Sequence, residues 1–232
     1  MTAAQTSVSR LHGLLLGTAV GDSLGLPVEG LSPRRASRLF PGPWRQRLLL
    51  GRGMISDDTE HTIFVCQALL ASPTSSSGFA RRLARSLRWW VASLPAGIGL
   101  ATLRATLRLW LGFSPRRSGV FSAGNGPAMR SAPIGAFFAG SPNHLDEYVA
   151  ASTRLTHTDP RALVGATAVA RLASWTLADS LDQRPPADAF LSLFENCGDG
   201  DDEWAEVVER IGDAAREDAP VAALAASLGL EE

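Results

Sequence analysis

The residues best equipped for chemistry are two adjacent carboxylates flanked by hydroxyls, in the run Ser56-Asp57-Asp58-Thr59-Glu60. Oxygen donors of this kind suit Mg²⁺, Mn²⁺ or Ca²⁺ and do not suit zinc. The alternative is a helix cap, because Asp57 with Glu60 resembles a capping box and acidic groups favour the positive end of a helix dipole. The pattern alone leaves both the metal site and the cap open.

A second segment with chemical potential is the run Ser122-Ala-Gly124-Asn125-Gly126-Pro127-Ala-Met129-Arg130. A glycine-rich turn that leads into a helix offers free backbone N–H groups to a phosphate. The same pattern also describes an ordinary turn and helix start. We therefore treat this segment as a candidate phosphate-binding loop.

Two single residues complete the set of candidates. His157 stands at a junction between a loop and a helix, in the run Thr156-His157-Thr158-Asp159-Pro160. Glu29 follows Pro27 just beyond the predicted end of the first helix. A lone histidine is more often structural than functional, and a carboxylate in such a loop is usually solvated. Neither His157 nor Glu29 identifies a functional site by itself.

The first predicted helix has glycine at every fourth position, at Gly17, Gly21 and Gly25. One face of this helix is therefore bare, which permits the close approach of another helix or of a ligand. The apolar run 14–20 is too short to span a bilayer, and Asp22 follows it where a signal peptide would need small cleavage-site residues. We therefore expect a cytoplasmic protein that has no membrane partner.

The elements that must position these residues are helices. Apolar residues recur at helical spacing, whereas strand signals are scarce. Predicted helices cover residues 8–24, 57–71, 78–93, 99–111, 127–139, 144–155, 160–181, 187–196, 202–217 and 219–228. Asp159 before Pro160 predicts a capped helix start. We expect an all-α fold, in a single compact multi-helix domain over residues 1–232.

Composition excludes several classes of protein. The chain has 232 residues, of which 45% are hydrophobic and 19% charged, so it is not disordered. Its net charge of −1 gives no sign of a nucleic-acid partner. Cys66 and Cys197 lie far apart, and the four histidines form no HxxxH pair, so neither a disulfide framework nor a zinc site is indicated.

Taken together and in this order, the segments resemble the ADP-ribosylglycohydrolase family. The resemblance covers about residues 11–180, and four motifs in the family's order argue against chance. The residues that carry it are Gly13 to Gly25 with Glu29, Ser56 to Thr59, Gly124 to Arg130, and Thr156 to Thr158.

The resemblance implies an all-α fold that holds a pair of Mg²⁺ or Mn²⁺ ions. It implies a hydrolase that removes ADP-ribose from a modified protein or a small molecule, by cleaving the glycosidic bond at the ribose anomeric carbon. The metal ligands would be Ser56, Asp57 and Asp58, and the catalytic residues Glu29 and Asp58. The residues that bind ADP-ribose would be Ser122, Gly124, Asn125, Gly126, Met129 and His157.

These residue types are consistent with that reaction. Cleavage at the anomeric carbon builds oxocarbenium character. Metal ions can orient the ribose hydroxyls and polarise water. A carboxylate such as Glu29 can then accept the proton of the attacking water.

One family motif has no good match here. Family members carry Gly-Gly-Asp-x-Asp-Thr, or a close variant, late in the chain, and the run 198–202 is only a loose echo of it. We expect a chain that is incomplete at its C-terminus or has lost the motif, and that holds one ion or none. The alternative function is a homologue that binds ADP-ribose or a protein partner without turnover. We expect a monomer or a weak homodimer, since uncovered apolar surface would invite dimerisation.

Overall fold

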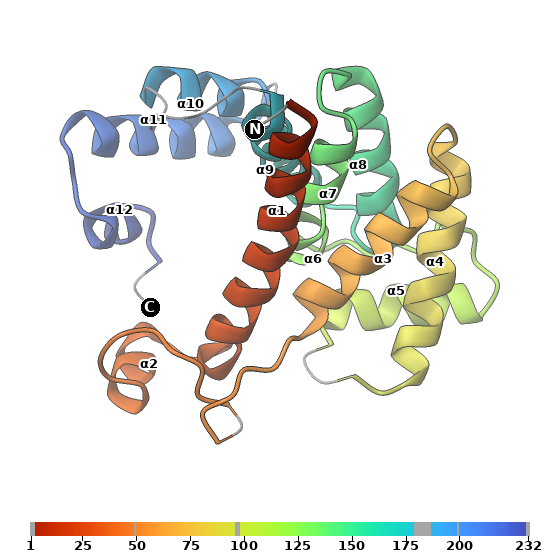
Figure 1. Ribbon diagram of the computed structural model, residues 1–232, viewed down its shortest axis with the longest axis horizontal. Coiled ribbons are helices and arrows are strands. Elements are labelled where there is room, and N and C mark those ends of the chain that lie inside the picture. Colours follow the sequence, from red (N-terminus) through yellow and green to blue (C-terminus); the bar gives the residue numbers. More distant parts are fainter. Residues whose placement is uncertain (1–2, 49, 96–97, 179–186, 199, 231–232) are drawn as a thin grey trace. The chain divides into compact units, whose positions relative to one another are not determined.

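The computed structural model describes residues 3–48, 50–95, 98–178, 187–198 and 200–230 (Figure 1). Within these ranges the chain forms twelve α-helices and a short 3₁₀ helix, with no strand beyond an isolated bridge between Val120 and His157. The prediction of an all-α fold is confirmed. The chain divides into two compact units, Met1–Ser23 with Met54–Ser180, and Leu24–Gly53 with Leu181–Glu232. The single domain over residues 1–232 stays a prediction.

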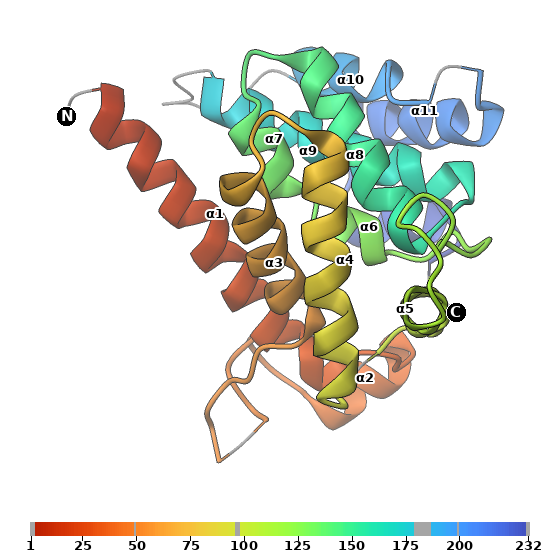
Figure 2. The ribbon, with the colours of Figure 1, turned by 90° about the vertical axis from the view of Figure 1, so that its right-hand side faces the viewer.

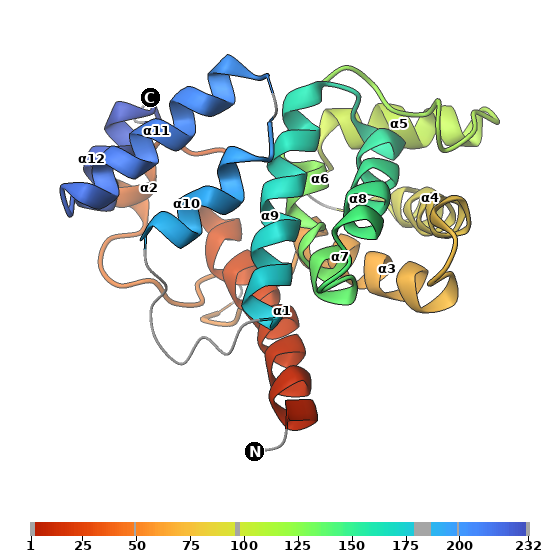
Figure 3. The same ribbon diagram turned by 90° about the horizontal axis from the view of Figure 1, so that it is seen from above.

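The larger unit is built from eight helices, counted over its described residues. They are α1 (Ala3–Gly25, whose last two residues belong to the smaller unit), α3 (Asp57–Ala71), α4 (Ser76–Ala92), α5 (Leu100–Trp110), α6 (Gly126–Met129), α7 (Ala132–Phe137), α8 (Pro142–Thr156) and α9 (Pro160–Ala178). Helices α3 and α4 lie side by side (Figure 2), and α7 and α8 pack on α9 (Figure 3).

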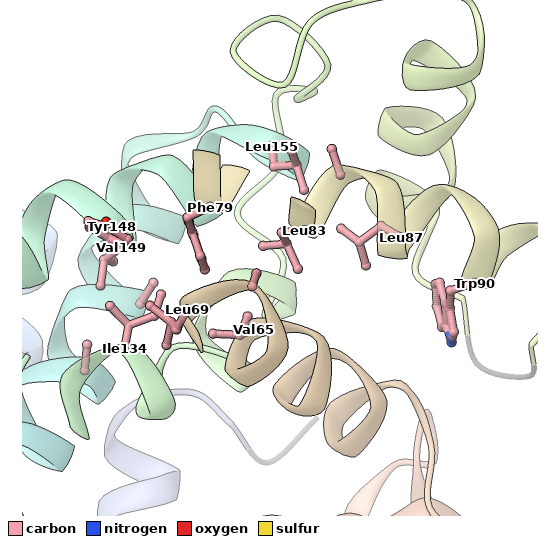
Figure 4. Packing of buried hydrophobic residues seen from close by; sticks show 14 of the residues in the cluster. Val65, Leu69, Phe79, Leu83, Leu87, Trp90, Ile134, Tyr148, Val149 and Leu155 are labelled. Atoms are coloured by element: carbon pink, nitrogen blue, oxygen red, sulfur yellow. The ribbon is translucent and has the colours of Figure 1, made fainter. Parts of the chain in front are cut away.

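The core of this unit forms where α4 meets α3 and α8. Phe79, Leu83 and Leu87 follow one another at intervals of four residues on α4, so they share one face of the helix. These side chains are fully buried, together with Val65 and Leu69 of α3 (Figure 4). The packed face fixes the direction of α3, and with it the position of the carboxylates at its start.

Close packing of α7 on α9 depends on a glycine. A Cβ atom added to Gly135 would lie 1.8 Å from the backbone oxygen of Ala170, so no other residue fits there without moving a helix. The close approach holds α7, and the segment that precedes it, against the rest of the unit.

The smaller unit contains the remaining described elements. They are the 3₁₀ helix η1 (Leu26–Val28), α2 (Pro33–Leu39), α10 (Ala187–Glu195), α11 (Asp202–Arg216) and α12 (Val221–Ser227). Helix α2 is absent from the sequence prediction, although Ser32 followed by Pro33 is a usable start signal. Helices α10 and α11 pack against each other.

Most predicted helices agree with the structure, but the predicted helix over 127–139 is wrong. The segment forms two short helices, α6 and α7, which are separated at Arg130 and Ser131. Pro133 has no N–H to donate to the carbonyl of Met129, so the helical ladder does not continue through it, whereas proline is well placed near the start of α7. The capped start at Asp159 is confirmed, because the Asp159 carboxylate accepts a hydrogen bond from the Arg161 backbone N–H at 3.0 Å.

Helix α1 is longer than the apolar run that predicts it. The segment Val8–Val28 is long and apolar enough to cross a membrane by length and composition, a test that core helices and signal sequences also pass. This corrects the argument from the shorter run 14–20. Only 6% of this stretch is buried. Cβ atoms added at Gly13, Gly17 or Gly21 would meet no described atom within 4 Å, so no described residue of the larger unit packs closely on these three glycines.

Candidate active site

A buried carboxylate on α1 holds the start of α3. The Asp22 carboxylate accepts hydrogen bonds from the backbone N–H and the hydroxyl of Ser56, at 2.8 and 2.7 Å. It also accepts from the backbone N–H and the hydroxyl of Thr59, at 3.1 and 2.5 Å. Asp22, Ser56 and Thr59 are all buried. Each oxygen of this carboxylate therefore has a partner, and the first turn of α3 has an acceptor for two N–H groups.

This arrangement tests the interpretation of Asp57 with Glu60 as a capping box. The capping-box interpretation of Asp57 with Glu60 is wrong, because α3 begins at Asp57 and its N-cap residue is Ser56. The Ser56 side chain makes no cap hydrogen bond of its own. The carboxylate of Asp22, on α1, accepts the hydrogen bonds that an N-cap side chain would otherwise accept. Glu60 accepts a hydrogen bond from the indole N–H of Trp90 at 2.6 Å.

The neighbouring carboxylates, Asp57 and Asp58, are half-buried at the start of α3. Burial, together with the negative charges of Asp57 and Asp22, raises the pKa of Asp58 to about 6. Three carboxylates thus stand close enough to repel one another. A hard divalent cation is the kind of group that relieves such repulsion.

The oxygen donors present limit what kind of ion could be held. No group of three His, Cys, Asp or Glu side chains is placed to hold a metal ion in the described part of the chain. The Asp22 carboxylate already accepts four hydrogen bonds from Ser56 and Thr59, so the candidate ligands are Asp57, Asp58 and the Ser56 hydroxyl. Because Ser56 gives its proton to Asp22, its oxygen lone pairs stay available. This set suits one Mg²⁺ that keeps several water ligands.

The glycine-rich loop wraps the ring of His157. A Cβ atom added to Gly124 would lie 3.1 Å from His157 Nε2, and one added to Gly126 would lie 2.9 Å from His157 Cε1. The loop and the histidine, distant in sequence, therefore form one structure. Ser122 belongs to the same structure, since its hydroxyl accepts a hydrogen bond from the Gly124 N–H at 3.2 Å.

Backbone contacts fix this loop against the end of α8. Val120 forms a parallel bridge with His157, in which the Val120 N–H bonds to Thr156 O at 3.1 Å and the Thr158 N–H to Val120 O at 2.9 Å. Gly119 lies against the backbone oxygen of Arg154, where a Cβ atom would come within 2.4 Å. The tight fit explains why the loop is rich in small residues.

A buried guanidinium, that of Arg130, lies between these two regions. Its Nη2 donates to the backbone oxygen of Ser152 at 2.9 Å and to the hydroxyl of Thr156 at 2.8 Å, and its Nε donates to Ser152 Oγ at 3.1 Å. Its Nη1 lies 3.5 Å from His61 Nδ1. Arg130 is fully buried and bonds to no carboxylate among the described residues. Burial lowers its pKa to about 10, so it stays charged at neutral pH.

Arg130 also links the histidines to the carboxylates electrostatically. The charge of Asp57 acts to raise the pKa of Arg130. Burial, and after it the charge of Arg130, lowers the pKa of His157 to about 4 and that of His61 well below its usual value. Both rings are therefore neutral at physiological pH. Met129 lies against α3 as well, since its backbone oxygen accepts from the Thr62 hydroxyl at 3.3 Å.

The structure thus brings most of the predicted site residues into one unit. The start of α3 carries Ser56, Asp57 and Asp58, and the packed loop carries the residues around His157. Asn125 precedes α6, which is only four residues long, so a helix dipole contributes little to phosphate binding there. Glu29 lies in the smaller unit, exposed at the end of η1, and its role at the reaction centre stays a prediction.

Sequence reasoning did not identify three residues that hold these groups in place. Asp22 and Arg130 stand within quoted motifs, but nothing in their spacing indicates that they bond to residues 34 and 26 positions away. Thr156 was part of the histidine motif without a role. A charged residue inside an otherwise apolar or small-residue run is the signal that could have found Asp22.

The chain as a whole is similar to known proteins. The sequence matches the ADP-ribosylglycohydrolase family over residues 3–230. It is 35% identical over 182 residues to an uncharacterized protein from Archaeoglobus fulgidus, covering 75% of this chain and 58% of that protein. It is 31% identical over 160 residues to the ADP-ribosyl-[dinitrogen reductase] glycohydrolase of Rhodospirillum rubrum, covering 65% of this chain and 52% of that enzyme.

A solved structure agrees with these relatives. An ADP-ribosylglycohydrolase-related protein complex has a chain that is similar with a TM-score of 0.58 and 29% identity, over 82% of this chain and 62% of its own. The present chain spans between 52% and 62% of the length of each of the three proteins. Since the family match extends over nearly all of its residues, this chain belongs to the ADP-ribosylglycohydrolase family.

Proposed function

We propose that this chain is a metal-dependent hydrolase that releases ADP-ribose from a modified protein or small molecule. The bond broken is the glycosidic bond at the ribose anomeric carbon. The observation that supports this most is the junction at Arg130, which brings the carboxylates of α3 and the His157 loop into one unit of a chain that belongs to a glycohydrolase family.

The carboxylates Asp57 and Asp58, with the Ser56 hydroxyl, would hold one Mg²⁺ or Mn²⁺. Such an ion supplies Lewis acidity toward ribose hydroxyls and water when it is bound. The hydrogen bonds that Asp22 accepts from the backbone of Ser56 and Thr59 would hold the start of α3, and with it the two carboxylates, in place. Preorganised donors of this kind avoid the cost of ordering the site at each turnover.

The remaining residues would bind the substrate and accept a proton from the attacking water. Ser122, Gly124, Asn125, Gly126 and Met129 would line the pocket for ADP-ribose, with His157 in contact with the ligand. Glu29 would accept the proton of the attacking water, and Asp58 would be the second catalytic carboxylate. A positive charge at the anomeric carbon develops as the leaving group departs, and nearby carboxylates stabilise it.

A release assay on the full chain tests the proposal. We would incubate it with ADP-ribosyl-arginine protein, ADP-ribosyl-serine peptide and O-acetyl-ADP-ribose, in Mg²⁺ or in EDTA, and measure free ADP-ribose. We expect Mg²⁺-dependent release from at least one substrate, reduced about 100-fold or more in Asp58→Asn. The matched control is Asp188→Asn, which makes the same change at an exposed carboxylate. No release from any of the three substrates would contradict the proposal.

A second function is favoured by the hydrogen bonding of Asp22. Its carboxylate accepts four hydrogen bonds from Ser56 and Thr59, so it holds the start of α3 and is a poor ligand for an ion. A protein that binds ADP-ribose without turnover would need no more than the His157 loop. ADP-ribose that binds with a measurable Kd, while no substrate is cleaved, would identify this alternative.

A further inference from the structure

The hydroxyl of Thr156 takes part in two hydrogen bonds. Arg130 Nη2 lies 2.8 Å from Thr156 Oγ1, and the same oxygen lies 2.8 Å from His157 Nδ1. Thr156 and Arg130 are fully buried and His157 is 2% exposed. The three groups form a short chain of hydrogen bonds that ends on the imidazole.

The number of available protons fixes which atom donates in each of these hydrogen bonds. A guanidinium can only donate, so Thr156 Oγ1 accepts from Arg130. The one hydroxyl proton of Thr156 then needs an acceptor, and His157 Nδ1 is its other partner among the described residues. If Nδ1 carried the proton instead, the buried hydroxyl proton would have no partner, which is costly. Nδ1 is therefore the acceptor.

The opposite nitrogen of the ring faces the glycine loop. His157 Nε2 lies 3.1 and 3.6 Å from the positions that Cβ atoms would occupy on Gly124 and Gly126. It has no hydrogen-bond partner among the residues that the structure describes. Any side chain at these two positions would cover Nε2, so the glycines leave the nitrogen reachable.

We propose that Arg130 and Thr156 are positioning residues that hold His157 with its proton on Nε2, so that the ring presents a neutral N–H donor to an acceptor oxygen of the ADP-ribosyl group. The ligand half of this statement rests on the proposed function, whereas the proton position does not. A neutral donor selects a ligand by the placement of an oxygen and not by its charge. The ring also gains a fixed orientation, because Nδ1 is held by the Thr156 hydroxyl.

Nuclear magnetic resonance of the wild-type chain tests the proton position without any ligand. Protein labelled with ¹⁵N-histidine would be studied at pH 7, with the His157 signals assigned from the spectrum of His157→Gln. We expect a protonated-type shift at Nε2 and an unprotonated, hydrogen-bonded shift at Nδ1. A proton on Nδ1, a charged ring or a rapidly exchanging mixture would overturn the proposal.

A pair of substitutions tests the role of the hydroxyl. Thr156→Val removes both the donor to His157 Nδ1 and the acceptor of Arg130 Nη2, and Thr156→Ser keeps both. We expect the Kd for ADP-ribose to rise about tenfold in Thr156→Val and to stay within about twofold of wild type in Thr156→Ser. Thr156→Val should also move the Nδ1 shift toward that of a nitrogen without a hydrogen bond.

The outcomes separate this proposal from the proposed function. Unchanged affinity and an unchanged Nδ1 shift in Thr156→Val would overturn the role of Thr156. If wild-type protein does not bind ADP-ribose, the proposed function fails, and the wild-type spectrum alone decides the position of the proton. The same spectrum decides it if Thr156→Val does not fold.

Discussion

Asp22 and Arg130 are both buried charged residues, yet they stabilise the larger unit in different ways. Asp22 accepts four hydrogen bonds from Ser56 and Thr59, within one turn of one helix. Arg130 donates to Ser152 and Thr156 on α8 and lies beside His61 on α3. The acidic centre therefore orders the start of one helix, whereas the basic centre joins two helices that are distant in sequence.

The difference teaches how a buried charge can be tolerated without an ion pair. Asp22 is satisfied by hydrogen bonds to N–H and O–H groups, and Arg130 by carbonyl and hydroxyl oxygens. Neither has a partner of opposite charge in hydrogen-bond contact within the described chain. Such centres are costly to disturb, because the groups around them lose their partners when the charge is removed.

The largest effect is expected from Arg130→Met. This change fills similar space but leaves the backbone oxygen of Ser152 and the hydroxyls of Ser152 and Thr156 without their donors. We expect a loss of about 4 kcal/mol in the free energy of unfolding, measured by denaturant or thermal unfolding. The control is Arg117→Met, since Arg117 is exposed. Equal stabilities of the two variants would show that the Arg130 hydrogen bonds contribute nothing to folding.

The next effect is a dependence of stability on pH. His61 and His157 have pKa values lowered by burial and by Arg130, the latter to about 4. Below about pH 6.5 the unfolded chain binds protons at these rings while the folded chain does not, so the contribution of the two rings to stability falls as pH falls toward 4. Asp58, whose pKa is raised to about 6, contributes in the opposite direction. We expect His157 alone to contribute a loss of up to about 3 kcal/mol over this range.

Thermal unfolding across pH 4 to 7 checks this sign. The variant His157→Gln removes one of the two rings, so the stability of the wild type relative to this variant should fall as the pH falls through this window. A difference between the two that does not change with pH would contradict the account of His157.

A smaller effect is expected from Asp22→Asn, which keeps the shape but turns one acceptor oxygen into a donor. Three of the four hydrogen bonds end on Oδ2 and one on Oδ1, so the amide NH2 group of Asn loses at least one of them and meets the donor groups of Ser56 and Thr59. We expect about 2 kcal/mol of destabilisation, with the loss of metal-dependent turnover. Asp188→Asn is again the matched control. Full activity in Asp22→Asn would show that the cap does not position Asp57 and Asp58.

The smallest effect is expected between two amide variants, His157→Gln and His157→Asn. The side-chain amide of Gln reaches the place of Nε2, whereas that of Asn reaches only the place of Nδ1. If the ring presents its Nε2–H to the ligand, His157→Gln should bind ADP-ribose about tenfold more tightly than His157→Asn, as titration calorimetry would measure. Equal or reversed affinities would place the donor elsewhere.

Local signals in the sequence predicted much of the fold. The start of α3 at Asp57 and the cap of α9 at Asp159 follow from residue types within a few positions. Helix α2 was missed because its seven residues have little apolar periodicity, and the helix over 127–139 was broken by Pro133. Local sequence patterns therefore located most helices, but they did not predict the break between α6 and α7.

The candidate site could be predicted only in part. The resemblance supplied the carboxylates and the histidine, but their supporting residues depend on long-range contacts. Asp22 meets Ser56 across 34 positions, and Arg130 meets Thr156 across 26. No local pattern encodes such pairs. The exposure of α1 was likewise not evident from its composition, since Leu16 is 67% exposed in a helix that reads as apolar.

The most direct test of the central claim is thermal unfolding of the full chain with Mg²⁺ and ADP-ribose, added separately and together. A ligand at 100 times its Kd stabilises a protein by about 2.7 kcal/mol, which moves the midpoint by several degrees. The account predicts the largest increase in Tm with both ligands present, and its loss in Asp58→Asn but not in Asp188→Asn. A cooperative transition that neither ligand moves would contradict the assignment of this site.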